Sequence, residues 1–234
     1  MRMRRVLACW PLALGMALAC ASAPAPPAPG TAQAFGVLRL VPPAGAEAGG
    51  GADAYGDRRL RDVEFVDYSK PGFAVVYVED AEPPAGVLDL TLRTTRVGTR
   101  LDPSKAAVGA GGRVTVRNAT DEAHVLSYPA AGVVHKLEPG QALELAVARA
   151  GEQGLYLLDV PDSEATLFAA PGSFSVVSAA GRFTLRDLRP GTRVLRVWHP
   201  RFPPARREVE LAPDASLEVD FDLGTGRKQH SHAH

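Results

Sequence analysis

Three histidines stand at every second position near the end of the sequence, at His230, His232 and His234. In an extended backbone this spacing lets an imidazole cluster wrap a divalent ion such as Cu²⁺, Ni²⁺ or Zn²⁺. The alternative interpretation is a solvated polar tail with incidental metal affinity, because residues from Gly224 onward include no apolar anchor. The sequence thus predicts a disordered His-rich tail over residues 225–234, with metal binding as its candidate chemistry.

Trp198 is the second candidate for ligand chemistry. With Tyr128 or Tyr156 it could form a platform on which a sugar ring stacks, because flat aromatic faces suit pyranose rings. Trp198 also follows Val197 in a strand-like segment, and a tryptophan in that setting commonly packs in a core. Carbohydrate binding at Trp198 and core packing of Trp198 are therefore alternative hypotheses.

No arrangement of residues typical of an enzyme is present in the sequence. Ser173 lies between Gly172 and Phe174 without the flanking pattern of a nucleophile elbow. Paired carboxylates such as Asp80 with Glu82 fall at predicted turns, where solvated charges are the expected interpretation. No glycine-rich loop of phosphate-binding spacing follows a strand and opens a helix. We therefore expect no enzymatic activity.

The first nineteen residues have the pattern of a secretory leader. Arg2, Arg4 and Arg5 give a positive start, residues 6–19 are largely apolar, and small residues precede Cys20. The apolar run is too short for a membrane-spanning helix and has no polar face of its own. The sequence predicts a signal peptide over residues 1–19 and hence export from the cytoplasm.

Two interpretations of the cleavage site at Cys20 remain open. An ordinary leader peptidase could cut after Ala19, whereas a lipoprotein peptidase would cut there to make Cys20 the lipidated first residue. The second is favoured because Cys9 leaves with the leader, so Cys20 is the only thiol of the mature chain. Residues 20–34 are rich in proline and alanine and read as an extended tether. We expect a periplasmic or cell-surface protein, lipid-anchored to the outer membrane.

The charge of the chain is balanced. Lysine and arginine number 26, and aspartate and glutamate also number 26. Loss of the three leader arginines leaves the mature chain at a charge of about −3 with no basic patch. Nucleic acid is therefore not an expected partner. A membrane, through the lipid anchor, and an unknown protein or glycan are the expected partners.

Short alternating segments joined by Gly/Pro turns dominate the sequence from residue 35. In Ser216–Leu223 every second residue is apolar, which predicts a strand with Leu217, Val219, Phe221 and Leu223 on one face. The segment Phe73–Val78 is the most hydrophobic and is expected to be a central strand. Residues 142–150 come closest to helical spacing but read equally well as a strand, because Leu143, Leu145 and Val147 alternate with Ala and Glu. Strands of this length, with turns every 8–12 residues, are typical of a β-sandwich.

Several segments together resemble a known family. They are, in chain order, Val75–Glu79, Leu101–Pro103, Gly112–Asn118 with Asp121 and His124, and Gly181–Leu185 with Leu188, Pro190–Thr192 and Val197–His199. Residues 73–223 resemble exported bacterial cupredoxin-like proteins of the methylamine-utilisation and plastocyanin-like type. Those proteins also carry a small sandwich related to the carboxypeptidase regulatory domain. The resemblance implies a cupredoxin-like β-sandwich joined to a regulatory-like one.

The copper chemistry of that family does not carry over by resemblance. A type 1 copper site needs two imidazoles and one thiolate, usually with a weak thioether. In family members that bind copper, the later ligands fall in one loop, and the matching stretch here, Tyr156–Asp162, holds no Cys, His or Met. His124 alone matches a ligand position. We therefore expect no cofactor apart from a divalent metal at the tail. In that alternative His124 could supply one further ligand.

The predicted organisation follows from these observations. It comprises a signal peptide (1–19), a tether (20–34), a cupredoxin-like β-sandwich (35–178), a regulatory-like β-sandwich (179–224) and the His-rich tail (225–234). The fold class is all-β. The cupredoxin-like sandwich is either followed by the small regulatory-like sandwich or merged with it. The expected function is a non-enzymatic extracytoplasmic binding or interaction module without type 1 copper. Alternatives are a periplasmic metal carrier that uses the tail and a carbohydrate-binding module.

Overall fold

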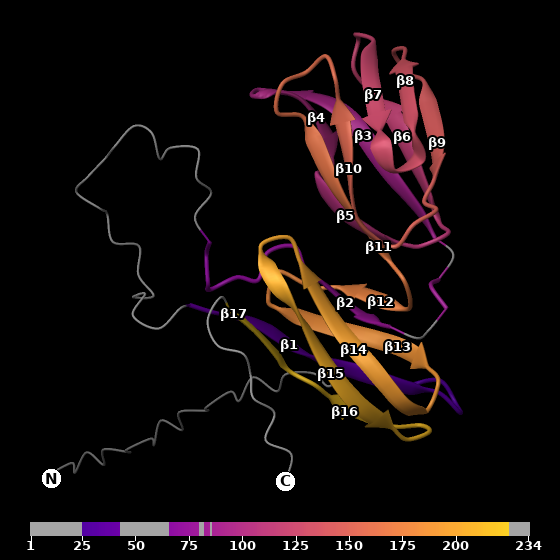
Figure 1. Ribbon diagram of the computed structural model, residues 1–234, viewed down its shortest axis with the longest axis vertical. Helices are drawn as coiled ribbons and strands as arrows, with labels where there is room; N and C mark the ends of the chain where they lie inside the picture. The colour runs from indigo at the N-terminus through magenta and orange to yellow at the C-terminus, as the bar shows by residue number, and fades with distance from the viewer. Residues whose placement is uncertain (1–24, 43–65, 80–81, 85, 225–234) are drawn as a thin grey trace, which may run out of the picture.

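The computed structural model describes residues 25–42, 66–79, 82–84 and 86–224. Throughout this part the protein is all-β, as the alternating sequence predicts, and a short 3₁₀ turn, η2 (Pro129–Ala131), is the helical element between the strands. Two β-sandwiches lie next to each other (Figure 1). None of the described residues forms a helix long and apolar enough to cross a membrane.

The first unit, which we call the central sandwich, comprises residues 86–170. One of its sheets has the strand order β4-β3-β6-β9, and the facing sheet has the order β5-β11-β10-β7-β8. The bounds are β3 Val87–Thr95, β4 Gly98–Asp102, β5 Lys105–Gly109, β6 Arg113–Asn118, β7 His124–Tyr128, β8 Val133–Leu137, β9 Ala142–Ala146, β10 Gly151–Leu157 and β11 Glu164–Ala170.

Period-two alternation places the core of the central sandwich between its two sheets. Leu90 and Leu92 of β3 are buried, whereas Asp89 of the same strand faces solvent. Leu126 and Leu155 come from the facing sheet and join the same apolar cluster. Burial of a leucine side chain contributes about 1.5–3 kcal/mol. The ambiguous segment at residue 142 is confirmed as a strand, β9.

The second unit, the terminal sandwich, combines both ends of the described chain. Its sheets have the orders β12-β2-β14-β15 and β13-β1-β16, with β17 also paired to β1. The bounds are β1 Ala32–Val41, β2 Val75–Val78, β12 Phe174–Val176, β13 Arg182–Leu188, β14 Gly191–His199, β15 Phe202–Leu211, β16 Ser216–Glu218 and β17 Phe221–Gly224. The strand β2 lies inside its sheet, so the predicted central position of residues 73–78 is confirmed.

The last predicted strand is divided in two. Val219, Phe221 and Leu223 are buried as the alternation predicts, but β16 ends at Glu218 and β17 begins at Phe221. Between them the carboxylate of Asp220 accepts a hydrogen bond from the amide of Val37 at 2.8 Å, in place of a backbone carbonyl. A Cβ at Gly36 would lie 2.1 Å from the carbonyl oxygen of Val219, so this close approach requires glycine.

The strand pairing corrects the expected division of the chain. Strands β1 and β2 were expected in a sandwich of residues 35–178, but they pair with β13, β16, β17 and β14 of the terminal sandwich. The central sandwich is therefore inserted between β2 and β12. Alternation shows that a segment is a strand and which face is apolar, but it does not identify the partner strand.

An aromatic cluster joins the two sandwiches. Trp198 of β14 stacks on Phe168 of β11, with ring centroids 4.5 Å apart and planes 18° apart. The ring of Phe73 meets that of Trp198 edge-on, with centroids 5.9 Å apart, and the ring centroids of Tyr77 and Phe168 are 5.5 Å apart. We call this group the junction cluster; it also includes Val75, Ala107, Ala170 and Phe174. It lies beside the two chain connections between the sandwiches.

Candidate functional site

His124 begins β7 and is a buried side chain, only 3% exposed. Its Nδ1 atom lies 2.7 Å from Oδ2 of Asp159, which belongs to the loop between β10 and β11. The other carboxylate oxygen, Oδ1, accepts a hydrogen bond from the amide of Val125 at 2.8 Å. Since an ionised carboxylate only accepts hydrogen bonds, Nδ1 of His124 carries a proton and donates a hydrogen bond to Asp159. One carboxylate thus fixes both the ring and the backbone at the start of β7.

The charge of Asp159 is stabilised by these contacts. Desolvation by itself raises the pKa of the carboxyl, but the hydrogen bonds from the Val125 amide and from His124 outweigh it, so the pKa of Asp159 is lowered. The second ring nitrogen of His124, Nε2, is buried and has no hydrogen-bond partner among the described residues. His124 is therefore buried at the start of β7 and is held by a carboxylate of the loop between β10 and β11.

The donor atoms around His124 do not fit a type 1 copper centre. The loop of Asp159 brings no sulfur and no second imidazole, and both cysteines and all three methionines of the chain precede residue 21. Nδ1 faces a carboxylate. Within the described ranges no three His, Cys, Asp or Glu side chains gather in a geometry that could hold a metal ion. A blue-copper geometry depends on a thiolate, which this loop cannot supply.

His199, at the end of β14, uses both ring nitrogens structurally. Nε2 donates to the carbonyl oxygen of Pro71 at 2.9 Å, and Nδ1 accepts from the amide of Arg201 at 3.0 Å. These two bonds require the neutral ring, and desolvation by burial lowers the pKa of His199. The side chain fixes the segment before β2 against the end of β14, so it is not available to a metal.

Trp198 does not form an aromatic platform with the tyrosines considered beside it. One of its faces is covered by Phe168. Tyr128 is buried in the central sandwich, where its hydroxyl bonds to Gln153. Tyr156 is partly exposed and belongs to β10 of the central sandwich. The structure thus places Trp198 in the junction cluster and leaves carbohydrate binding there without a shared aromatic surface.

The remaining predicted site residues lie outside the described ranges. They are Cys20, the candidate lipidation site, and the tail histidines His230, His232 and His234. Lipidation at Cys20 and metal binding by the tail stay predictions. His135 is half-buried on β8, and its Nε2 lies 3.4 Å from Nε2 of Gln141.

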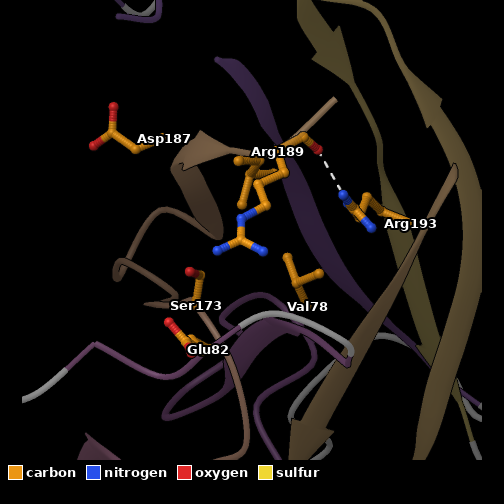
Figure 2. A pocket seen from close by; sticks show the side chains of 7 residues that line it. Val78, Glu82, Ser173, Asp187, Arg189 and Arg193 are labelled. Atoms are coloured by element: carbon orange, nitrogen blue, oxygen red, sulfur yellow. Dashed lines mark hydrogen bonds between the residues drawn. The ribbon is translucent and has the colours of Figure 1, made fainter. Parts of the chain in front are cut away.

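A pocket that sequence reasoning missed lies at one end of the terminal sandwich, beside both connections to the central one. It has a volume of about 210 Å³ and is lined by Val78, Glu82, Ser173, Asp187, Leu188, Arg189 and Arg193. Figure 2 shows the guanidinium of Arg189 extended over Ser173 and Val78, with the carboxylate of Glu82 beside Ser173 and Asp187 pointing away. These residues come from three distant segments, so their proximity is not visible in the sequence.

One signal for this pocket was present in the sequence of β13. Phe183 and Leu185 alternate as a strand requires, but the next buried residue is Leu188, which breaks the period of two. In the structure Leu185 pairs with Ala34 and Leu188 with Ala32, so β13 carries an extra residue there. Asp187 adopts a left-handed φ of 54° within this bulge. Bulges redirect side chains, and this one precedes Arg189.

Comparison with known proteins gives low-similarity matches to solved cupredoxins. No family model and no curated protein matches the chain. A purple cupredoxin from Nitrosopumilus maritimus is 17% identical, with a TM-score of 0.31 over 36% of this chain and 99% of that one. Amicyanin from Paracoccus versutus is 14% identical (TM-score 0.31; 40% and 96% covered), and plastocyanin from Dryopteris crassirhizoma is 17% identical (TM-score 0.30; 35% and 98% covered). The description of this chain as a pair of β-sandwiches rests on its own strand pairing.

Proposed function

We propose that this chain is a non-enzymatic, exported binding protein, in which a cupredoxin-like sandwich without type 1 copper is inserted into a sandwich of the carboxypeptidase-regulatory type. The observation that carries the proposal is the contact between His124 and Asp159. The one imidazole that matches a copper ligand is held by a carboxylate, and its neighbouring loop has no soft donor. The central sandwich then acts as a scaffold and not as an electron carrier.

The contact pattern around His124 supports a structural role. Asp159 accepts from both His124 and Val125 and so links the loop after β10 to the start of β7. In a copper protein this loop must deliver ligands to the metal, whereas here it is attached by a carboxylate to the strand it faces. The central sandwich has an apolar core and antiparallel ladders of its own, and the proposal assigns its stability to them.

The proposed location is outside the cytoplasm, with a lipid anchor on Cys20. The support is the leader pattern of residues 1–19, followed by a proline-rich tether. Metabolic labelling with a fatty-acid probe tests the anchor. The proposal expects label on the wild-type chain and none on Cys20→Ser, with both proteins exported. Export of an unlabelled wild-type chain would contradict the anchor.

Thermal unfolding with and without a chelator tests the metal-free scaffold. If no metal contributes to the fold, the unfolding temperature of the purified chain is the same before and after treatment with EDTA, because a bound ligand adds stability only when it favours the folded state. A drop on chelation that is reversed by added copper would overturn the proposal.

A further inference from the structure

The pocket at the end of the terminal sandwich has opposite charges on its two sides. Arg189 supplies a guanidinium and Glu82 a carboxylate, and both line the cavity with the hydroxyl of Ser173 (Figure 2). Within the described part of the chain, Arg189 and Glu82 form no ion pair with each other, and neither the Arg189 guanidinium nor the Ser173 hydroxyl has a hydrogen-bond partner. A cation and an anion that share a cavity without touching leave room for a ligand that pairs with both.

The local structure holds Arg189 in place from behind. Arg193 donates from Nε to the carbonyl oxygen of Arg189 at 3.0 Å and from Nη2 to that of Pro190 at 3.1 Å. The bulge at Asp187 turns the chain so that Leu188 is buried and the next side chain, Arg189, extends into the pocket. The guanidinium is thus carried on a fixed backbone, which lowers the entropy lost when it binds a ligand.

The lining sets the chemistry of the ligand. A guanidinium binds a carboxylate through two parallel hydrogen bonds, and a carboxylate such as that of Glu82 binds an ammonium group. The hydroxyl of Ser173 can donate or accept between them. Val78 and Leu188, both buried, give the cavity an apolar wall. A volume of about 210 Å³ is below the range of about 300–1,000 Å³ usual for drug-sized ligands.

We infer that this pocket binds a small zwitterion of the amino-acid type, with its carboxylate on Arg189 and its ammonium group on Glu82. The inference rests on the proposed binding function and names its ligand class. A simple anion is disfavoured because Glu82 repels it, and a simple cation because Arg189 does. A zwitterion satisfies both charges and leaves its side chain against Val78 and Leu188.

Isothermal titration of the full chain with three matched probes tests the site. L-alanine carries both charges, propionate only the carboxylate and ethylamine only the ammonium group. We expect saturable binding of alanine, and binding of propionate and ethylamine weaker by about tenfold or more, which corresponds to about 1.4 kcal/mol. Arg189→Gln and Glu82→Gln should each weaken alanine binding by a similar factor. Arg186→Gln changes an exposed arginine of β13 that lies three residues before Arg189 and outside the pocket, and should leave alanine binding unchanged.

Three results would overturn the inference. The first is the absence of saturable alanine binding at about 10 mM. The second is propionate binding as tight as alanine binding, together with an unchanged alanine affinity in Glu82→Gln. The third is a loss of alanine affinity in Arg186→Gln equal to that in the two pocket variants. Circular dichroism confirms that each variant is folded. A copper titration of the same preparation distinguishes the two proposals. If alanine does not bind and no blue colour appears, the ligand inference is wrong but the scaffold role stands. If an intense blue colour appears, the proposed function itself is overturned.

Discussion

The Nδ1 atom of His124 donates to the carboxylate of Asp159 across the gap between β7 and the loop after β10, at 2.7 Å. Because Asp159 also accepts from the amide of Val125, Asp159→Asn replaces one acceptor oxygen with a donor and leaves a buried group unpaired. We expect the free energy of unfolding to fall by about 1–3 kcal/mol. Urea denaturation measures this, and Asp162→Asn, an exposed neighbour in the same loop, serves as control. Equal stability of the two variants would show that the contact contributes nothing.

The stacked rings of Trp198 and Phe168 couple the two sandwiches. Phe168→Ala should lower the free energy of unfolding by about 3–5 kcal/mol, since Phe168 is buried, and Trp198→Ala should lower it by less, since Trp198 is only partly buried. A double-mutant cycle should give a coupling energy of about 0.5–1.5 kcal/mol. The matched cycle of Trp198→Ala with Phe221→Leu, in the other sheet of the terminal sandwich, should give none. Coupling near zero in both cycles would contradict a packed junction.

Trp198 also provides a test of the carbohydrate alternative. With one ring face covered by Phe168 and with Tyr128 buried in the central sandwich, we expect no glycan whose binding depends on Trp198. A glycan array that compares the wild-type chain with Trp198→Ala measures this. A glycan bound by the wild type and lost in the variant, with the variant folded, would restore the hypothesis.

Acid should weaken the segment held by His199. Burial lowers the pKa of its imidazole from 6.5, because the folded state needs the neutral ring to accept from Arg201 and donate to Pro71. Well above pH 6.5 the imidazole of His199 is neutral in both the folded and the unfolded chain, so it adds no pH dependence to the stability. As the pH falls below that value the unfolded chain gains the proton first, and stability declines until the folded-state pKa is reached.

Chemical denaturation at pH values from about 7 to about 5 measures this decline. His199→Gln keeps a side-chain donor but cannot be protonated, so its stability should depend less steeply on pH than that of the wild type. His135→Gln, on β8 with a long contact to Gln141, is the matched control and should keep the wild-type slope. A His199→Gln variant with the unchanged slope would show that another group is responsible.

The sequence predicted the fold class because alternation is local. The pattern of Val219, Phe221 and Leu223 shows in any window of the sequence, and these three residues are buried as predicted. Pairing is not local. The partner of β17 is β1, more than half the chain away, and loop entropy rises too slowly with length to exclude such a pairing. For this reason the assignment of β1 and β2 to the sandwich of residues 35–178 was wrong.

The candidate site was predictable to the same limited degree. The lack of Cys, His and Met in the loop matching the copper ligands is a matter of composition, and so was visible in the sequence. That Asp159 pairs with His124 depends on the pairing of β7 with β10 in one sheet, which no local pattern reports. The pocket of Arg189 and Glu82 depends on a bulge and two connections, and only the broken alternation at Leu188 hinted at it.

The tail histidines offer a separate test of the metal-carrier alternative. We expect a copy lacking residues 225–234 to unfold at the same temperature as the full chain, because the cores of both sandwiches are built from residues before Gly224. Titration of both proteins with Cu²⁺ compares their affinities. Tight binding by the full chain that is lost on truncation would favour the carrier, whereas equal and weak binding by both would exclude it.

The most direct test of the account is the visible spectrum of the purified chain during titration with Cu²⁺. The contact between His124 and Asp159, with no thiolate in the facing loop, predicts no intense blue absorbance at any ratio of copper to protein. Asp159→Ala, which frees His124, should behave in the same way, because the missing sulfur is not restored. An intense blue band that saturates at one copper per chain would contradict the central claim.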